Sequence, residues 1–287
     1  MNNNARIISI SGNPVSGKST VVKKMIEKLK ERGFSDENIH LVSTGTMFRK
    51  CFNKVMNLIS SIGNESSIGN EEKMIEYSKD KDIRKILKNQ TYRKKIRDLY
   101  ISLKQSGIDP KKYDIANANT SQELGSIRHI IDEIVDSEIT ELGKQIIENN
   151  NPDEAWLIDS RLAFHNIPES FAVRLTVRDD VAAKRLINDS SRGDEDNNYQ
   201  SLEEAKKKVV ERKQGEQERY KRRYGIDLED EENYNIIIDT SYSDVDKIAD
   251  TILTCVELDR DGNEYEKINP DIHRATEILE SPDPQEL

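Results

Sequence analysis

The chain has 287 residues, of which 34% are hydrophobic, so it can bury a sizeable core in one large domain or two small ones. Its formal net charge of −10 argues against sequence-independent binding of a nucleic-acid backbone, which needs a basic surface. We find neither a secretory signal nor an apolar run of membrane-spanning length, and therefore expect a cytoplasmic protein without membrane or nucleic-acid partners. Its two cysteines are far apart and predict neither a disulfide framework nor a zinc site.

Short runs rich in β-branched and apolar residues predict five strands, at 6–11, 39–43, 155–159, 172–177 and 235–239. Helical spacing of apolar residues predicts helices at 19–32, 179–187, 202–224 and 243–258. Because a strand, a helix and a strand in succession give parallel pairing, we expect an α/β fold with a five-stranded parallel doubly wound core. We expect the second strand to lie beside the first.

About 110 residues with few strand signals separate the second strand from the third. We interpret 51–150 as a helical insertion into a core made of 1–50 and 151–258, with an acidic extension at 259–287. Within the insertion, residues 60–71 repeat Ser-Ser-Ile-Gly-Asn-Glu twice, which predicts a polar loop lengthened by duplication. The insertion could also contact a protein partner.

A glycine-rich loop, residues 12–19, lies between the first strand and the first helix and matches the pattern G-x-x-x-x-G-K-[ST]. Such glycines let backbone N–H groups point at phosphate oxygens beside a helix N-terminus. Lys18 would reach the β and γ phosphates, and the Ser19 hydroxyl would bind Mg²⁺. The residues expected to bind ATP are Gly12, Asn13, Pro14, Val15, Ser16, Gly17, Lys18, Ser19 and Thr20. A chance match in a turn is the alternative, which the flanking strand and helix disfavour.

Polar residues follow the second and third strands, at the edge where parallel sheets bind ligands. After the second strand, Ser43 and Gly45 are small and Arg49 could bind a second phosphate, although a solvated helix arginine fits equally well. The third strand ends at Asp159, which could hold a Mg²⁺-bound water or orient the acceptor, and Arg161 after it could clamp an anionic acceptor. The alternative for Asp159 and Arg161 is a pair that only caps the strand end.

The helix predicted over 202–224 carries Arg212, Glu216 and Arg219 at positions i, i+4 and i+7, so all three project from one face. Considered by itself, such a charged face is more often solvated than functional. An arginine-lined face could nevertheless bind an anionic ligand.

The connection before that helix, about 188–200, is polar and contains glycine, which is the composition of a mobile lid. Arg185 and Arg192 could close from it on a transferring phosphoryl group. The residues expected to act in catalysis are Lys18, Asp159, Arg185 and Arg192, with Ser19 and Asp159 as metal ligands.

Taken together, these segments resemble the cytidylate kinases, particularly the shorter archaeal-type branch of that family of P-loop nucleoside monophosphate kinases. The matching segments are ISISGNPVSGKST (8–20), VSTGTMFR (42–49), LIDSRLA (157–163), the Arg-x₃-Glu-x₂-Arg pattern within 211–230, and IIIDTS (236–241). The glycine-rich loop is shared by many NTPases, whereas S-T-G-x-x-x-R and ERYKRRYGIDL are much more specific.

The resemblance implies Mg²⁺-dependent transfer of the ATP γ-phosphoryl group to CMP or dCMP. It also implies roles for the acceptor-side residues: Ser43 and Gly45 against the cytosine, Arg49, Arg161 and Arg212 on the acceptor phosphate, Glu216 and Arg219 at the base edge, and Arg185 and Arg192 in the lid. A carboxylate at residue 216 would select cytosine over uracil, because uracil has a carbonyl in place of the exocyclic amine.

The chain departs from the family pattern in two places. Ser160 stands where the family usually has glycine, and the 51–150 insertion is larger than the usual acceptor-side domain and shows no match. Two alternatives therefore stay open. One is a kinase for another small acceptor, and the other is a nucleotide-binding regulatory or scaffold protein whose insertion and tail bind a partner.

Overall fold

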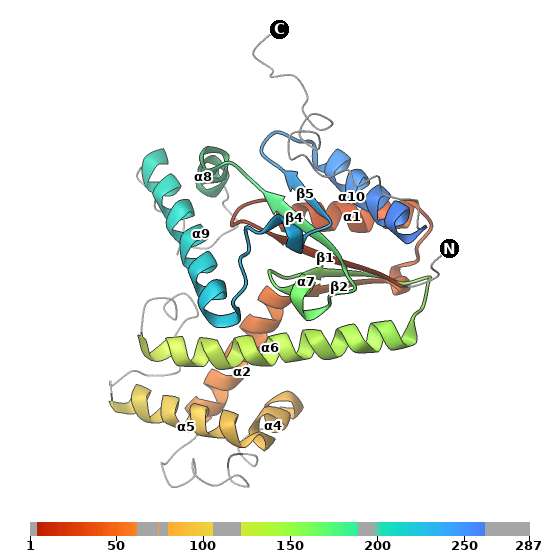
Figure 1. Ribbon diagram of the computed structural model, residues 1–287. Helices are drawn as coiled ribbons and strands as arrows, with labels where there is room; N and C mark the ends of the chain where they lie inside the picture. Colours follow the sequence, from red (N-terminus) through yellow and green to blue (C-terminus); the bar gives the residue numbers. More distant parts are fainter. Residues whose placement is uncertain are drawn as a thin grey trace. The chain divides into compact units, whose positions relative to one another are not determined.

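The computed structural model describes residues 5–61, 74, 80–105, 122–188, 199 and 201–261 (Figure 1). The chain divides into two compact units, the first comprising Met1–Ser43 and Thr140–Leu287 and the second Thr44–Ile139. Arg192, most of the tandem repeat, most of the expected lid and nearly all of the acidic extension lie outside the described residues.

The first unit contains a five-stranded sheet in the order β2-β3-β1-β4-β5, and every pair of neighbouring strands is parallel. The strands are β1 (Arg6–Gly12), β2 (Ile39–Ser43), β3 (Ala155–Asp159), β4 (Phe171–Thr176) and β5 (Ile236–Asp239). The five parallel strands and the α/β class expected from the sequence are thus confirmed. The doubly wound arrangement stays a prediction.

The expected position of the second strand is wrong. β3 lies between β1 and β2 and pairs with both, so β2 is at the edge of the sheet. Burial gives the physical reason. Ala155, Leu157 and Ile158 of β3 are fully buried, as suits an internal strand, whereas no residue of β2 is buried and Leu41 is 50% exposed.

Helices α1 (Lys18–Glu31) and α10 (Val245–Arg260) pack together on one face of the sheet (Figure 1). Alternate residues of the strands, such as Ile8 and Ile10 of β1, form the core on this face together with apolar side chains of both helices. A second pair, α8 (Asp179–Asn188) and α9 (Leu202–Tyr224), follows β4 in the chain. The remaining short elements are η1 (Asp36–Asn38), α7 (Ala163–Asn166) and η5 (Glu231–Asn233).

On the other face of the sheet, β1 and β4 also carry buried polar side chains. Ser9 and Ser11 of β1 and Arg174 of β4 are all buried. Arg174 Nη2 lies 2.6 Å from Glu229 Oε1, and its guanidinium lies over the ring of Tyr234. A buried arginine needs such a partner, because an unpaired charge inside the protein would be costly. We call the surface formed by Ser9, Ser11 and Arg174 the polar floor of the sheet, and it lies next to the end of β1.

In the second unit, every described element is a helix. These helices are α2 (Thr44–Ser61), α4 (Lys81–Lys88), α5 (Gln90–Gln105) and the part of α6 (Gln122–Asn149) up to Ile139. Apolar side chains on their inner faces form the core of the unit, among them Phe52, Leu87, Ile96 and Ile131, each at most 1% exposed. Among the described helices of both units, none combines the length and apolarity needed to cross a bilayer.

Candidate functional site

The glycine-rich loop makes a tight path between β1 and α1. A Cβ atom on Gly12 would come within 2.3 Å of the Leu175 carbonyl oxygen, which also accepts a hydrogen bond from Asn13 N at 3.1 Å. Gly17 caps α1 with a left-handed backbone, φ 79°, and Val15 also has a positive φ of 64°. That conformation is rare for a β-branched residue and is maintained only where surrounding contacts impose it. The loop therefore has a specific, constrained backbone.

Lys18 lies at the start of α1 and turns back toward the loop. Its Nζ donates to the Gly12 carbonyl at 3.1 Å. Burial, assisted by the positive charge of Arg161, lowers the pKa of Lys18 to about 8, against the opposing influence of Asp159 and Glu216. With Arg212 included, the charges of four other residues that the sequence assigned to this site thus act on Lys18.

Arg185 supports the loop from α8. Its Nη1 donates to the Val15 carbonyl at 3.4 Å and to Thr240 Oγ1 at 3.1 Å, and its Nη2 donates to the Thr240 carbonyl. Thr240 Oγ1 in turn lies 2.9 Å from the carbonyl oxygen of Ser16. The guanidinium thereby links the loop to the end of β5. These contacts let Arg185 hold the loop, and its action on a transferring phosphoryl group, expected from the sequence, stays a prediction.

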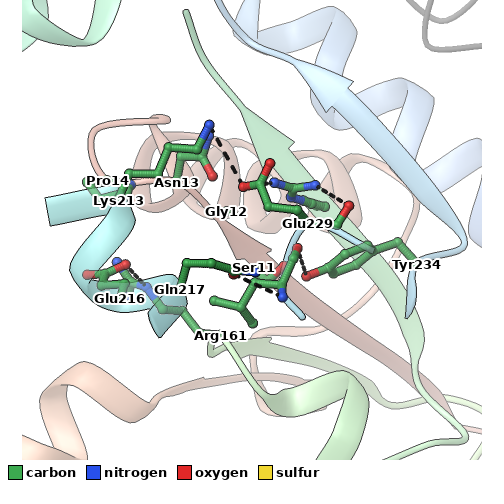
Figure 2. Close-up of a pocket in the computed structure, with 12 residues that line it drawn as sticks. Ser11, Gly12, Asn13, Pro14, Arg161, Lys213, Glu216, Gln217, Glu229 and Tyr234 are labelled. Carbon is green, nitrogen blue, oxygen red and sulfur yellow. Dashed lines mark hydrogen bonds and ion pairs between the residues drawn. The ribbon is translucent and has the colours of Figure 1, made fainter. Parts of the chain in front are cut away.

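An ion-pair cluster lies beside the loop, between β3 and α9 (Figure 2). Arg161 Nε is 2.5 Å from Glu216 Oε2, and both residues are labelled in Figure 2. Arg212 Nε is 3.6 Å from Glu216 Oε1. The Glu216 side chain is only 15% exposed, so its carboxylate is nearly enclosed by the two arginines. Arg219, on the same helix, has its guanidinium 4.8 Å from the ring centre of Tyr220.

A pocket lies where the loop, the polar floor of the sheet and α9 meet (Figure 2). Gly12, Asn13 and Pro14 line it from the loop, and Arg161 and Glu216 line it from the ion-pair cluster. The sequence reasoning missed its other charged or hydrogen-bonding side chains, which are Ser11, Arg174, Lys213, Gln217, Glu229 and Tyr234. One signal was available for Arg174, because an arginine within the apolar run Phe171–Thr176 is unusual in a buried strand.

The remaining acceptor-side residues lie in different places. Ser43 ends β2 in register with Asp159 at the end of β3, so both stand at the carboxyl edge of the sheet. Gly45 and Arg49 belong to α2 in the second unit, where Arg49 Nη2 donates to Thr46 Oγ1 at 3.3 Å.

The donors available for a metal are oxygens. Ser19 is exposed in the first turn of α1, and Asp159 contributes a carboxylate from the end of β3. Within the described ranges there is no group of three or more His, Cys, Asp or Glu side chains that could hold an ion. Mg²⁺ is usually bound by one or two carboxylates together with substrate phosphates. One hydroxyl and one carboxylate beside a phosphate-binding pattern fit that mode.

A parallel α/β sheet with a glycine-rich loop at the end of its central strand, followed by a lysine and a helix, is typical of nucleotide-binding proteins. The chain belongs to the cytidylate kinase-like family, whose family model matches residues 7–242. The resemblance stated from the sequence motifs is therefore confirmed.

Curated relatives are similar over part of their length. A cytidylate kinase of Methanocaldococcus jannaschii is 31% identical over 130 residues, and one of Methanosphaera stadtmanae is 27% identical over 116 residues. These matches cover 44% and 40% of this chain, and 65% and 62% of the two kinases. An S-adenosylmethionine-dependent nucleotide dehydratase of Lacinutrix mariniflava is 33% identical over 103 residues, which is 36% of this chain and 20% of that protein. The chain thus matches less than two thirds of each relative.

Proposed function

We propose that the protein transfers the γ-phosphoryl group of ATP to CMP or dCMP with Mg²⁺. The observation that carries this proposal is the carboxylate of Glu216, enclosed by Arg161 and Arg212 next to the glycine-rich loop. Arginines without a carboxylate would serve any phosphate, whereas a fixed carboxylate can also accept a hydrogen bond from the amine of cytosine. The family and the two cytidylate kinase relatives support the same assignment.

Charge neutralisation and positioning account for most of the catalysis in such a transfer, so neither a covalent intermediate nor a strong base is required. Lys18 provides a cation at the loop for the β and γ phosphates. Backbone N–H groups of the loop would bind the same phosphates at the start of α1. Arg161 and Arg212 already form ion pairs, and an acceptor phosphate entering the pocket would compete with Glu216 for them.

Ser19 and Asp159 would hold Mg²⁺, whose charge would help to neutralise the phosphates. Arg192, in the expected lid, would supply a further cation to the transferring group. The family resemblance also assigns acceptor-binding roles to Gly45, Arg49 and Arg219. Ser43, in register with Asp159, would lie against the base.

A second candidate is a kinase for another nucleotide, because the dehydratase relative is named for a nucleotide without naming its base. All three curated relatives carry names that concern nucleotides, but they differ in the reaction. Nucleotide handling is thus the common property, and the identity of the acceptor is the part that needs measurement.

A turnover screen tests the proposal directly. Purified full-length protein, ATP and Mg²⁺ are incubated with CMP, dCMP, UMP, AMP or GMP, and ADP formation is followed. We expect the highest kcat/KM with CMP or dCMP, and loss of turnover in Lys18→Ala. Preference for another monophosphate would favour the second candidate. Saturable ATP binding without turnover on any acceptor would favour a nucleotide-binding regulatory or scaffold protein. The 51–150 insertion and the acidic extension would then bind a protein partner.

A further inference from the structure

The two halves of α9 are held in different ways. Its buried residues are Ala205 and Val209, both in the first half, where they pack in an apolar cluster with α8. Beyond Val209, no residue of this fully described helix is buried. Glu216 therefore lies in a half whose position depends on polar contacts, and each such contact has a large influence on where Glu216 points.

Gln217 makes the most specific of these contacts. Its side-chain amide donates to Asp227 Oδ1, and its side-chain carbonyl accepts from the backbone N of Leu228 at 3.1 Å. Asp227 Oδ1 also accepts a hydrogen bond from Glu229 N at 2.9 Å. The hydrogen bond from Glu229, followed by that from Gln217, lowers the pKa of Asp227. We call this set of contacts between Gln217, Asp227 and Leu228 the Gln217 bridge.

Residues 227–229, which the Gln217 bridge contacts, are themselves bound to the sheet. Glu229 forms the 2.6 Å ion pair with buried Arg174 of β4, and Tyr234 Oη donates to the Leu228 carbonyl at 3.0 Å. The bridge thus connects the second half of α9 to the polar floor of the sheet. Because residues 216 and 217 project about 100° apart around a helix, fixing one side chain against this floor fixes the direction of the other. In Figure 2, Gln217 and Glu216 extend from the same turn, with Glu216 meeting Arg161.

We propose that Gln217 is a positioning residue that sets Glu216 in the acceptor site and thereby sets discrimination between acceptor bases. This inference rests on the proposed function of Glu216. Gln217 also lines the pocket, but its amide is bound to Asp227 and Leu228, so its influence on Glu216 passes through the helix. An amide is needed at this position, because it must donate to a carboxylate and accept from a backbone N–H at the same time.

Gln217→Leu keeps the approximate size of the side chain and removes both hydrogen bonds, and Gln214→Leu is the matched control at an exposed position of the same helix. The acceptor is the monophosphate that wild type uses fastest. We expect Gln217→Leu to raise the KM for this acceptor about tenfold and narrow the preference among bases, with kcat and the KM for ATP within about twofold. The proposal is overturned if Gln217→Leu has the same KM for the acceptor as wild type, or if Gln214→Leu shows the same increase in this KM.

A rescue experiment separates positioning from general damage. Gln217→Glu places two carboxylates together and should raise the acceptor KM, whereas adding Asp227→Asn lets the new amide donate to the new carboxylate. We expect this double variant to recover most of the lost affinity. If the double variant does not recover affinity for the acceptor, the proposal is overturned. Should Gln217→Leu fail to fold, the comparison of Gln217→Glu with the double variant is the deciding test.

Hydrogen exchange makes the outcome independent of the proposed function. Without the bridge, backbone amides of 210–224 should exchange about threefold or more faster, while those of 202–209 keep their protection. If wild type phosphorylates no monophosphate, the proposed function fails. Unchanged exchange of 210–224 in Gln217→Leu would then overturn the bridge itself, and faster exchange would support it.

Discussion

Arg161 Nε and Glu216 Oε2 are 2.5 Å apart, although 55 residues separate them in the chain. This pair joins the end of β3 to the middle of α9. It places a carboxylate beside an arginine in the lining of the pocket next to the glycine-rich loop. An arrangement of this kind can recognise a phosphate and a base amine together.

Glu216→Gln removes the charge and keeps the shape of the side chain. We expect it to weaken CMP use by roughly 1–3 kcal/mol, to narrow the CMP-over-UMP ratio and to leave the KM for ATP nearly unchanged. Steady-state kinetics with both acceptors measures these effects. Glu218→Gln, at an exposed position two residues along the helix, is the control and should behave as wild type. If Glu216→Gln weakens ATP binding and leaves the CMP-over-UMP ratio unchanged, Glu216 is only a structural partner of the arginines.

The sequence predicted the local features of this site well, because these features depend on neighbours in the chain. All five strands lie within two residues of their expected bounds, and α9 spans the expected 202–224. The i, i+4 spacing of Arg212 and Glu216 likewise produced an ion pair. Local periodicity and spacing carry this information directly.

Features that depend on distant parts of the chain were not predictable in the same way. The position of β3 between β1 and β2 depends on which strand can be buried on both faces, and a strand–helix–strand pattern alone does not determine this. The pairs Arg161–Glu216 and Arg174–Glu229 each join residues 55 positions apart. No spacing rule connects such residues, so the roles of Arg174, Glu229 and Gln217 emerged only from the structure.

The lowered pKa of Lys18 predicts a pH dependence of activity. Lys18 is charged below its pKa of about 8, so kcat/KM for ATP should fall as pH rises through about 8. Bound phosphates favour the charged form, and kcat should therefore decline only at higher pH. Lys18→Arg stays charged throughout, so any remaining activity of this variant should lack the decline near pH 8. If Lys18→Arg shows the same fall in kcat/KM near pH 8, the titrating group is not Lys18.

The same pKa shift predicts a change in stability. Between about pH 8 and the ordinary Lys18 value of 10.5, the unfolded chain binds more protons than the folded one, so Lys18 makes stability rise with pH there. Below pH 8 the full cost of burying the charge is present. Lys18→Met should therefore raise the free energy of unfolding at pH 7 by about 1–3 kcal/mol while abolishing turnover. Urea denaturation of the unliganded protein measures this, and a less stable variant would contradict the expectation.

Two glycine substitutions should have opposite effects. Gly12→Ala places a Cβ 2.3 Å from the Leu175 carbonyl oxygen, so we expect a loss of about 2 kcal/mol or more of stability, together with impaired ATP binding. Gly215 lies within α9 with nothing within 4 Å of an added Cβ, so Gly215→Ala should stabilise by about 0.5–1 kcal/mol. Thermal denaturation of both variants tests the pair. Equal effects would mean that the constraint on the loop at Gly12 is absent.

Arg185 provides the test of how the loop is held. Its guanidinium donates to the carbonyls of Val15 and Thr240 and to the Thr240 hydroxyl, so it restrains the strained backbone at Val15 rather than acting only as a free cation. Arg185→Gln should raise the KM for ATP about five- to tenfold with a smaller effect on kcat, because the loop would lose part of its fixed shape.

Thr240→Val removes the hydroxyl of the same network and should shift the KM for ATP in the same direction, since this hydroxyl also meets the Ser16 carbonyl. Lys184→Gln, at the exposed neighbouring position of α8, loses a similar charge without touching the loop and should leave both constants unchanged. The opposite pattern for Arg185→Gln, a large loss of kcat with unchanged ATP affinity and a silent Thr240→Val, would place Arg185 on the transferring phosphoryl group instead. Comparison of the three variants under saturating acceptor therefore decides between support of the loop and direct action on the reacting phosphate.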